Sequence, residues 1–208
     1  MPTAQKLDLY KVHKAEYVAT KKPVLVKTSP AQYLTISGRG APASPEFQNK
    51  IGALYNVAFT LKMTQKFGGK DSKVCHLAGL YWGSGKEENL ACLDPSAWNW
   101  LLVIRVPDFI KEKDLQQAIG QLRAKGKTGD FDKVKLESLD EGSCVQMLHV
   151  GPYNQEKQTI DQMLAFAAKE GLSSRGKHHE IYLTDPRRVP AQRLRTILRF
   201  PVGKSEQG

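Results

Sequence analysis

The stretch HHEIYLTDP, residues 178–186, is the part of the chain from which the fold is worked out. Its side chains alternate with a period of two, which predicts a β-strand that the Asp185-Pro186 turn ends. One face of that strand carries His178, Glu180 and Tyr182, and the other carries His179, Ile181 and Leu183. Because Ile181 and Leu183 are typical core residues, the face with Glu180 is expected to line a groove. The simplest alternative is that Glu180 is a solvated surface residue, as most glutamates are.

Length and composition indicate a soluble globular protein. The chain has 208 residues, of which 40% are hydrophobic and 25% charged, and this suits one large domain or two closely packed half-domains. Apolar runs stay well short of the roughly 18 residues of a membrane helix, and the N-terminus is too polar for a signal sequence. We therefore expect a cytoplasmic protein without a membrane partner. Cys75, Cys92 and Cys144 are odd in number and widely spaced, which predicts neither a disulfide framework nor a zinc site.

The formal net charge of +10 raises the question of nucleic-acid binding. The Lys and Arg residues are spread along the chain, and the sequence has no helix-turn-helix, zinc-finger or aromatic RNA-binding motif. We therefore expect no specific nucleic-acid partner.

Hydrophobic periodicity and Gly or Pro breaks predict a mixture of strands and helices. The expected strands span residues 31–37, 75–82, 98–106, 134–139, 143–150, 178–183 and 193–202, and the expected helices span residues 44–67, 108–125 and 155–170. The N-terminal residues are expected to form an extended arm.

The second half of the chain repeats the plan of the first. Thr35-Ile36-Ser37-Gly38 resembles Leu148-His149-Val150-Gly151, Leu80-Tyr81-Trp82 resembles Ile181-Tyr182-Leu183, and Arg105-Val106-Pro107 resembles Arg199-Phe200-Pro201. The expected parts are an arm (1–23), a first half (24–107), a connecting helix and linker (108–132), a second half (133–202) and a tail (203–208). The order strand, helix, strand, strand thus occurs twice within one domain.

A duplication of this kind predicts an α+β molecule with pseudo-two-fold symmetry, in which the open sheet faces of the two halves meet around a central ligand groove. On that geometry Glu180 and Tyr182 would face Tyr81 and Tyr33 from the other half. The remaining large aromatic candidates for the groove are Tyr55, Trp82, Trp98 and Trp100. The alternative for each of them is a core or hinge position.

The combined motifs of the second half resemble the GyrI-like small-molecule-binding superfamily. They are HVGPY (149–153), HEIYLTDPR (179–187), LRTI (194–197) and PV (201–202). The likeness extends over nearly the whole chain, to the stand-alone members of about this length.

The resemblance implies duplicated strand-helix-strand-strand (SHS2) modules around an aromatic pocket with one buried glutamate, at the position of Glu180. In multidrug-sensing members that glutamate meets cationic lipophilic drugs. In the stand-alone branch it is associated with hydrolysis of the strained cyclopropane ring of DNA-alkylating cyclopropanoid compounds. His149 and Tyr153 of the matching motifs, and His178 beside Glu180, are further candidate ligand contacts.

Opening an activated cyclopropane with water requires a base, a donor to the developing oxyanion and aromatic walls. Glu180 is the candidate base, and Tyr182, Tyr55 or Tyr81 the candidate donor. We expect no cofactor, and no metal, because a third ligand beside His178 and Glu180 is not evident.

Two classes of function stay open, a detoxifying hydrolase and a non-catalytic binder of lipophilic, aromatic or cationic small molecules. The oligomeric state also stays open, with a homodimer among the alternatives.

Overall fold

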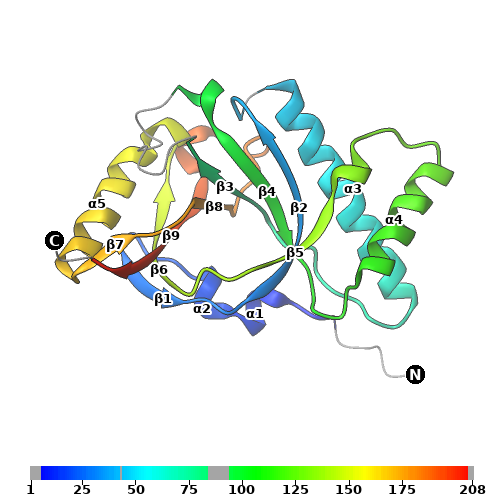
Figure 1. Ribbon diagram of the computed structural model, residues 1–208, viewed down its shortest axis with the longest axis horizontal. Coiled ribbons are helices and arrows are strands. Elements are labelled where there is room, and N and C mark those ends of the chain that lie inside the picture. Colours follow the sequence, from blue (N-terminus) through cyan, green and yellow to red (C-terminus); the bar gives the residue numbers. More distant parts are fainter. Residues whose placement is uncertain (1–5, 43, 84–93, 206–208) are drawn as a thin grey trace.

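One antiparallel sheet organises the molecule, and the computed structural model describes it within residues 6–42, 44–83 and 94–205. Its strands are β1 (Val24–Lys27), β2 (Ala31–Arg39), β3 (Leu77–Trp82), β4 (Asn99–Arg105), β5 (Lys135–Leu139), β6 (Ser143–Val150), β7 (Leu172–Ser174), β8 (His178–Tyr182) and β9 (Arg195–Lys204). Their order in the sheet is β1-β6-β9-β8-β3-β4-β2-β5, with the short β7 paired to β9 (Figure 1). The sheet and its helices confirm the predicted α+β class.

The element order strand, helix, strand, strand occurs in both halves of the chain. The first half supplies β2, α3 (Pro45–Phe67), β3 and β4, and the second supplies β6, α5 (Glu156–Lys169), β8 and β9. The halves join edge to edge through the antiparallel pair β3 and β8, and outward from this pair the strands follow as β4, β2 on one side and β9, β6 on the other. The duplication itself and its domain boundaries stay predictions, which this matching order supports.

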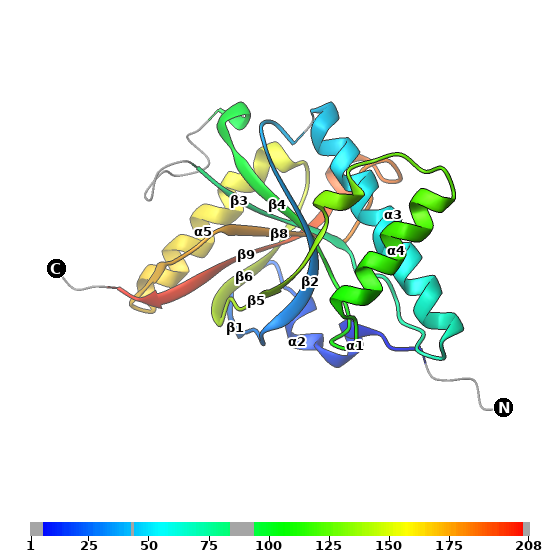
Figure 2. The same cartoon turned by 45° about the vertical axis from the view of Figure 1, so that its right-hand side comes forward.

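Both long helices of the halves cover the same face of the sheet. Helix α3 packs with Leu34, Tyr81 and Leu102, near one end of the sheet, and α5 packs with Met147 and Leu198 near the other (Figure 2). Helix α4 (Glu112–Ala124) lies against α3. The strand registers place Glu180 opposite both Leu198 and Gly79, and therefore on this helix-covered face. The expectation that two open sheet faces meet around the groove is wrong, because the halves form one continuous sheet.

Local sequence explains how helix α3 begins. Ser44 is its N-cap, with the side-chain oxygen accepting a hydrogen bond from the Phe47 amide at 3.2 Å, and Pro45 stands at the first helical position. The N-terminal arm differs from prediction, because it contains two short helices, α1 (Leu9–Val12) and α2 (Lys14–Tyr17), instead of an extended segment. Asp8 caps α1 by accepting from the Tyr10 amide at 3.0 Å.

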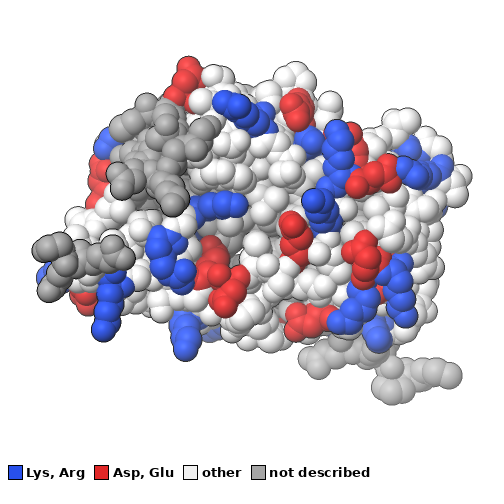
Figure 3. Space-filling model, in the orientation of Figure 1, with Lys and Arg blue, Asp and Glu red and all other residues white. Residues whose placement is uncertain are grey.

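Positive and negative side chains are mixed on the surface. On the face that Figure 3 shows, Lys and Arg side chains are scattered among Asp and Glu instead of forming one continuous basic area. Within the described residues, no helix has the length and apolar character that crossing a bilayer requires. Cys75 and Cys144 are buried free thiols, and Cys92 lies outside the described residues.

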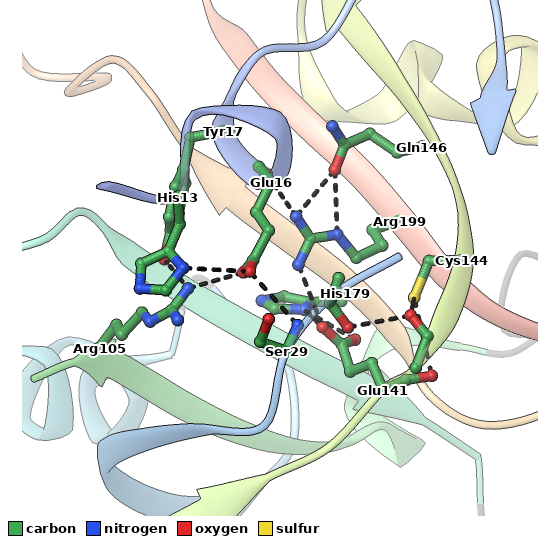
Figure 4. A network of polar contacts seen from close by, with 12 residues as sticks. His13, Glu16, Tyr17, Ser29, Arg105, Glu141, Cys144, Gln146, His179 and Arg199 are labelled. Atoms are coloured by element: carbon green, nitrogen blue, oxygen red, sulfur yellow. Dashed lines mark hydrogen bonds and ion pairs between the residues drawn. The ribbon is translucent and has the colours of Figure 1, made fainter. Parts of the chain in front are cut away.

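The other face of the sheet holds a buried ionic network under the N-terminal arm (Figure 4). The Arg199 guanidinium donates to Gln146 Oε1 at 2.8 and 3.0 Å, to Glu141 Oε2 at 3.1 Å and to the Glu16 carbonyl. Glu16 also pairs with Arg105 at 2.6 Å, and Glu141 lies 2.9 Å from His179 Nδ1. The network fastens helix α2 to strands β4, β6, β8 and β9.

Candidate functional site

Glu180 lies near the middle of the sheet, on strand β8, where the two halves of the chain meet. Its exposed fraction is only 8%, which excludes the alternative of a solvated surface glutamate. The alternation of β8 is as predicted, with Ile181 in the apolar cluster of the opposite face and Tyr182 packed against the cluster under α3. A buried carboxylate requires a hydrogen-bonding partner, and for Glu180 this is the Tyr182 hydroxyl of the same strand.

Two phenols form a hydrogen-bonded chain that ends on Glu180. The Tyr182 hydroxyl donates to Glu180 Oε2 at 2.8 Å, and the Tyr81 and Tyr182 oxygens lie 2.5 Å apart. Because the single hydroxyl proton of Tyr182 is donated to Glu180, Tyr81 is the donor in the bond between the two phenols. The chain therefore runs from Tyr81 on β3, through Tyr182, to the carboxylate, and each bond polarises the next.

Gly79 allows the Tyr81 ring to lie across strand β3. A Cβ atom at position 79 would lie 2.6 Å from the Tyr81 hydroxyl oxygen, closer than a real Cβ contact. Gly79 is also the residue paired with Glu180 across the two strands. A side chain at this position would thus push the Tyr81 hydroxyl away from Tyr182.

We expect Gly79→Ala to destabilise the protein by about 1–3 kcal/mol, as overpacking does in a filled interior. It should also weaken any function that depends on the Tyr81–Tyr182 contact. The matched control is Gly120→Ala on the exposed side of α4, where an added Cβ meets nothing within 4 Å. Denaturant unfolding of both variants tests the expectation, and equal stability of the two would contradict it.

Glu156, the first residue of α5, is a second buried carboxyl beside Glu180. It is 6% exposed, and its Oε1 atom has no hydrogen-bond partner among the described residues. Burial, then the charge of Glu180 and a hydrogen bond to it, raise the pKa of Glu156 well above its ordinary value. Two carboxyls this close do not both ionise unless a cation binds between them, so in the absence of a cation the pair holds one proton. Sequence reasoning missed this residue, because an acidic side chain in the first turn of a helix is ordinary.

His178 completes the polar group around Glu180. Its Nε2 atom lies 3.3 Å from Glu180 Oε1, yet off hydrogen-bonding geometry, and is buried without a hydrogen-bond partner among the described residues. Glu156, His178 and Glu180 each offer one atom within 4.8 Å of the others, so Glu156 is the third candidate metal ligand that the sequence did not reveal. The donors are two carboxyls and one imidazole, so either one proton shared by the carboxyls or one divalent cation would balance the charge of the pair.

Aromatic side chains surround this group from two directions. Tyr153 lies edge-on to Tyr182 with ring centroids 5.8 Å apart, and Trp98 lies edge-on to Tyr81 at the same distance. Tyr153 is 39% exposed. Tyr55 on α3 is partly buried against the same cluster and stacks on Phe59 at 6.0 Å.

Three of the other predicted contacts lie elsewhere. Tyr33 pairs with Arg105 and points to the opposite face of β2 from Leu34 and Ile36. It therefore belongs to the apolar cluster of that face. Trp82 follows Tyr81 directly, so it points to the opposite face, where Lys177 lies 3.7 Å from its ring centroid. Trp100 is on the face of Glu180 but is fully buried, donating from Nε1 to the Gly40 carbonyl at 3.0 Å. It is a core residue.

His149 positions the start of α5 instead of facing a ligand. Its Nε2 atom donates to the Pro152 carbonyl at 3.2 Å, so Nδ1 is free to accept from the Thr159 hydroxyl at 2.9 Å. These bonds hold Tyr153 and Glu156 over β8. Arg187 bonds Asp185 through its amide and guanidinium and fixes the turn after β8.

The structure thus places a buried carboxyl pair, a phenol chain and aromatic rings on the helix-covered face of the sheet in an α+β domain. The model of the GyrI-like small molecule binding domain matches residues 110–202. A conserved protein from Listeria innocua is 38% identical, with a TM-score of 0.89, covering 95% of this chain and all of that one. The chain therefore belongs to the GyrI-like family.

Other comparisons agree with this assignment. A hydrolase from Listeria innocua is 36% identical, with a TM-score of 0.87, covering 96% of this chain and all of that one. The C-terminal domain of EcmrR shares the fold, with 13% identity and a TM-score of 0.57 over 88% of this chain and 98% of that one. No curated protein matches the chain significantly.

Proposed function

We propose that this protein is a hydrolase that opens the strained cyclopropane ring of DNA-alkylating cyclopropanoid compounds, with Glu180 as the general base. The observation that carries the proposal is a buried Glu180 carboxylate, fixed by Tyr182 and bordered by aromatic rings. The similar hydrolase from Listeria innocua supports the reaction class. The likeness of the HEIYLTDPR motif to the stand-alone branch of the family supports the substrate class.

The reaction needs a water molecule between Glu180 and the ring. Glu180 takes a proton from that water while its oxygen forms a bond to the ring methylene. The ring carbon–carbon bond breaks, and its electron pair moves through the conjugated system to the carbonyl oxygen, which takes up a proton. The product is the substrate plus one water. Tyr153 and Trp98 supply flat apolar surface of the kind that holds an aromatic substrate.

The direct test is incubation of the purified protein with a cyclopropanoid compound. Mass spectrometry should detect conversion to a product that is heavier by one water, at a rate above that in buffer. A rate equal to that in buffer, with the compound nevertheless bound, would refute the hydrolase.

The second candidate is a binder that sequesters cationic lipophilic molecules without turnover. The observation that favours it is that a buried carboxylate among aromatic rings is also a counter-ion site. The family's description as a small-molecule-binding domain covers both candidates.

We expect any affinity for DNA to be weak, independent of sequence and steeply dependent on salt. Scattered Lys and Arg side chains release counterions from phosphates without reading base edges (Figure 3). A competition titration with two unrelated duplexes at low and moderate salt measures this. Sequence-selective binding that survives moderate salt would be contrary to the expectation.

A further inference from the structure

The hydrolysis proposed above needs a proton donor, and the phenols of the site are poorly suited to that role. Burial and the nearby Glu180 raise the pKa values of Tyr81 and Tyr182 well above the ordinary value of a phenol. The proton of Tyr182 is also engaged by Glu180, and that of Tyr81 by Tyr182. A donor works best when its pKa lies near the working pH, so these hydroxyls steady negative charge better than they transfer protons.

Glu156 has the features that the phenols lack. Burial within 4.8 Å of a second carboxyl favours its protonated form, and its Oε1 atom has no hydrogen-bond partner among the described residues. A buried polar atom without a partner is costly, and a ligand oxygen or nitrogen would satisfy it. His149 and Thr159 hold the start of α5, so Glu156 is presented from a fixed helix end.

We propose that Glu156 is a second catalytic carboxyl, which donates its proton to the carbonyl oxygen of the substrate while Glu180 takes the proton of the attacking water. The inference rests on the hydrolase proposed above and deepens it, since it restricts the substrates to strained rings conjugated to a hydrogen-bond-accepting oxygen.

Protons and electrons balance in this step. The water oxygen bonds to the ring methylene, the ring carbon–carbon bond breaks, and the electron pair reaches the carbonyl oxygen, which receives the Glu156 proton. Glu180 has meanwhile gained one proton from water and Glu156 has lost one. Because the two carboxyls lie within 4.8 Å of each other, the proton passes from Glu180 back to Glu156 and restores the resting pair. The contact between the two carboxyls is therefore useful in every cycle.

The test compares wild type with Glu156→Gln, in which an amide of similar shape has no proton to transfer. We expect turnover to fall by about 10²- to 10⁴-fold. Wild-type turnover should decrease as pH rises through the pKa of Glu156, because the protonated form is needed, and the variant should lack this decrease. The loss should be smallest for substrates whose product hydroxyl is most acidic, since these need protonation least. Glu170→Gln, at the exposed end of α5, is the matched control and should behave as wild type.

A measurement without turnover keeps the inference open to refutation if Glu156→Gln folds poorly. The infrared carbonyl band of a buried protonated carboxyl should be present in wild type at neutral pH and absent in Glu156→Gln. The inference would be overturned if wild type lacks the band. It would also be overturned if Mn²⁺ binds the pair and the band disappears. If Glu156→Gln turns over substrate at the wild-type rate, the inference is overturned as well, while the proposed hydrolase function stands. If wild type itself has no turnover, the proposed function fails first, and the proton transfer with it.

Discussion

Glu180→Gln should lower turnover of a cyclopropanoid substrate by about 10²- to 10⁴-fold, the usual contribution of a general base. Glutamine keeps the size of the side chain and can still accept from Tyr182, but it cannot take a proton from water. Binding of a neutral, flat substrate should stay close to wild type, because aromatic surface and not charge holds it. Single-turnover kinetics together with a binding titration separate the two quantities.

The same variant distinguishes an enzyme from a binder. If the protein only sequesters cations, there is no turnover to lose, and Glu180→Gln should weaken cationic ligands by roughly 1.5–3 kcal/mol, the worth of a charge-assisted hydrogen bond. Neutral ligands of equal shape should be unaffected in both cases. Full hydrolytic activity in Glu180→Gln would show that another group is the base, and Tyr182→Phe and Tyr55→Phe would then be examined next.

The residues of the site were predictable where they follow from the alternation of side chains along a single strand. The alternation of residues 178–182 places His178, Glu180 and Tyr182 together, and the repeat adds Tyr81 from the other half. Parity also explains one error, because Tyr81 and Trp82 are neighbours in a strand and therefore point to opposite faces. Tyr33 needed the register of β2 against β4, which the local sequence does not contain.

Glu156 and the faces of the sheet depended on tertiary structure. Nothing in the sequence around residue 156 distinguishes a carboxyl that turns inward from one that stabilises the helix N-terminus in solvent. Whether two halves stack face to face or join edge to edge depends on which edge strands pair. Here β3 pairs with β8, so both helices cover one face and the site lies between them.

The ionic network on the opposite face should be among the most sensitive parts of the fold. Arg199→Met should cost about 3–5 kcal/mol, because removing one partner from a buried ion pair leaves the other charge uncompensated. The loss removes the Arg199 donor from Gln146 Oε1 and from the Glu16 carbonyl, and leaves Glu141 with His179 alone (Figure 4). Arg195→Met, at the exposed first residue of the same strand, is the control and should change stability little. Denaturant unfolding at neutral pH measures both, and a similar small loss in both would contradict the expectation.

Acid should weaken the same network by protonating Glu141. Burial alone would raise the pKa of this carboxyl, but His179 and then Arg199 lower it to about 2 in the folded protein, from an ordinary value of 4.5. A pKa that is depressed by folding contributes stability that is present above pH 4.5 and lost as pH falls toward 2, in total roughly 3 kcal/mol. In Arg199→Met one of the two groups that lower the pKa of Glu141 is gone, so this pKa lies nearer to 4.5 in the folded protein and less stability remains to be lost over this range. Unfolding free energies measured from pH 5 to pH 2 should therefore fall more steeply for wild type than for Arg199→Met, and parallel curves would show that Arg199 does not stabilise the charge of Glu141.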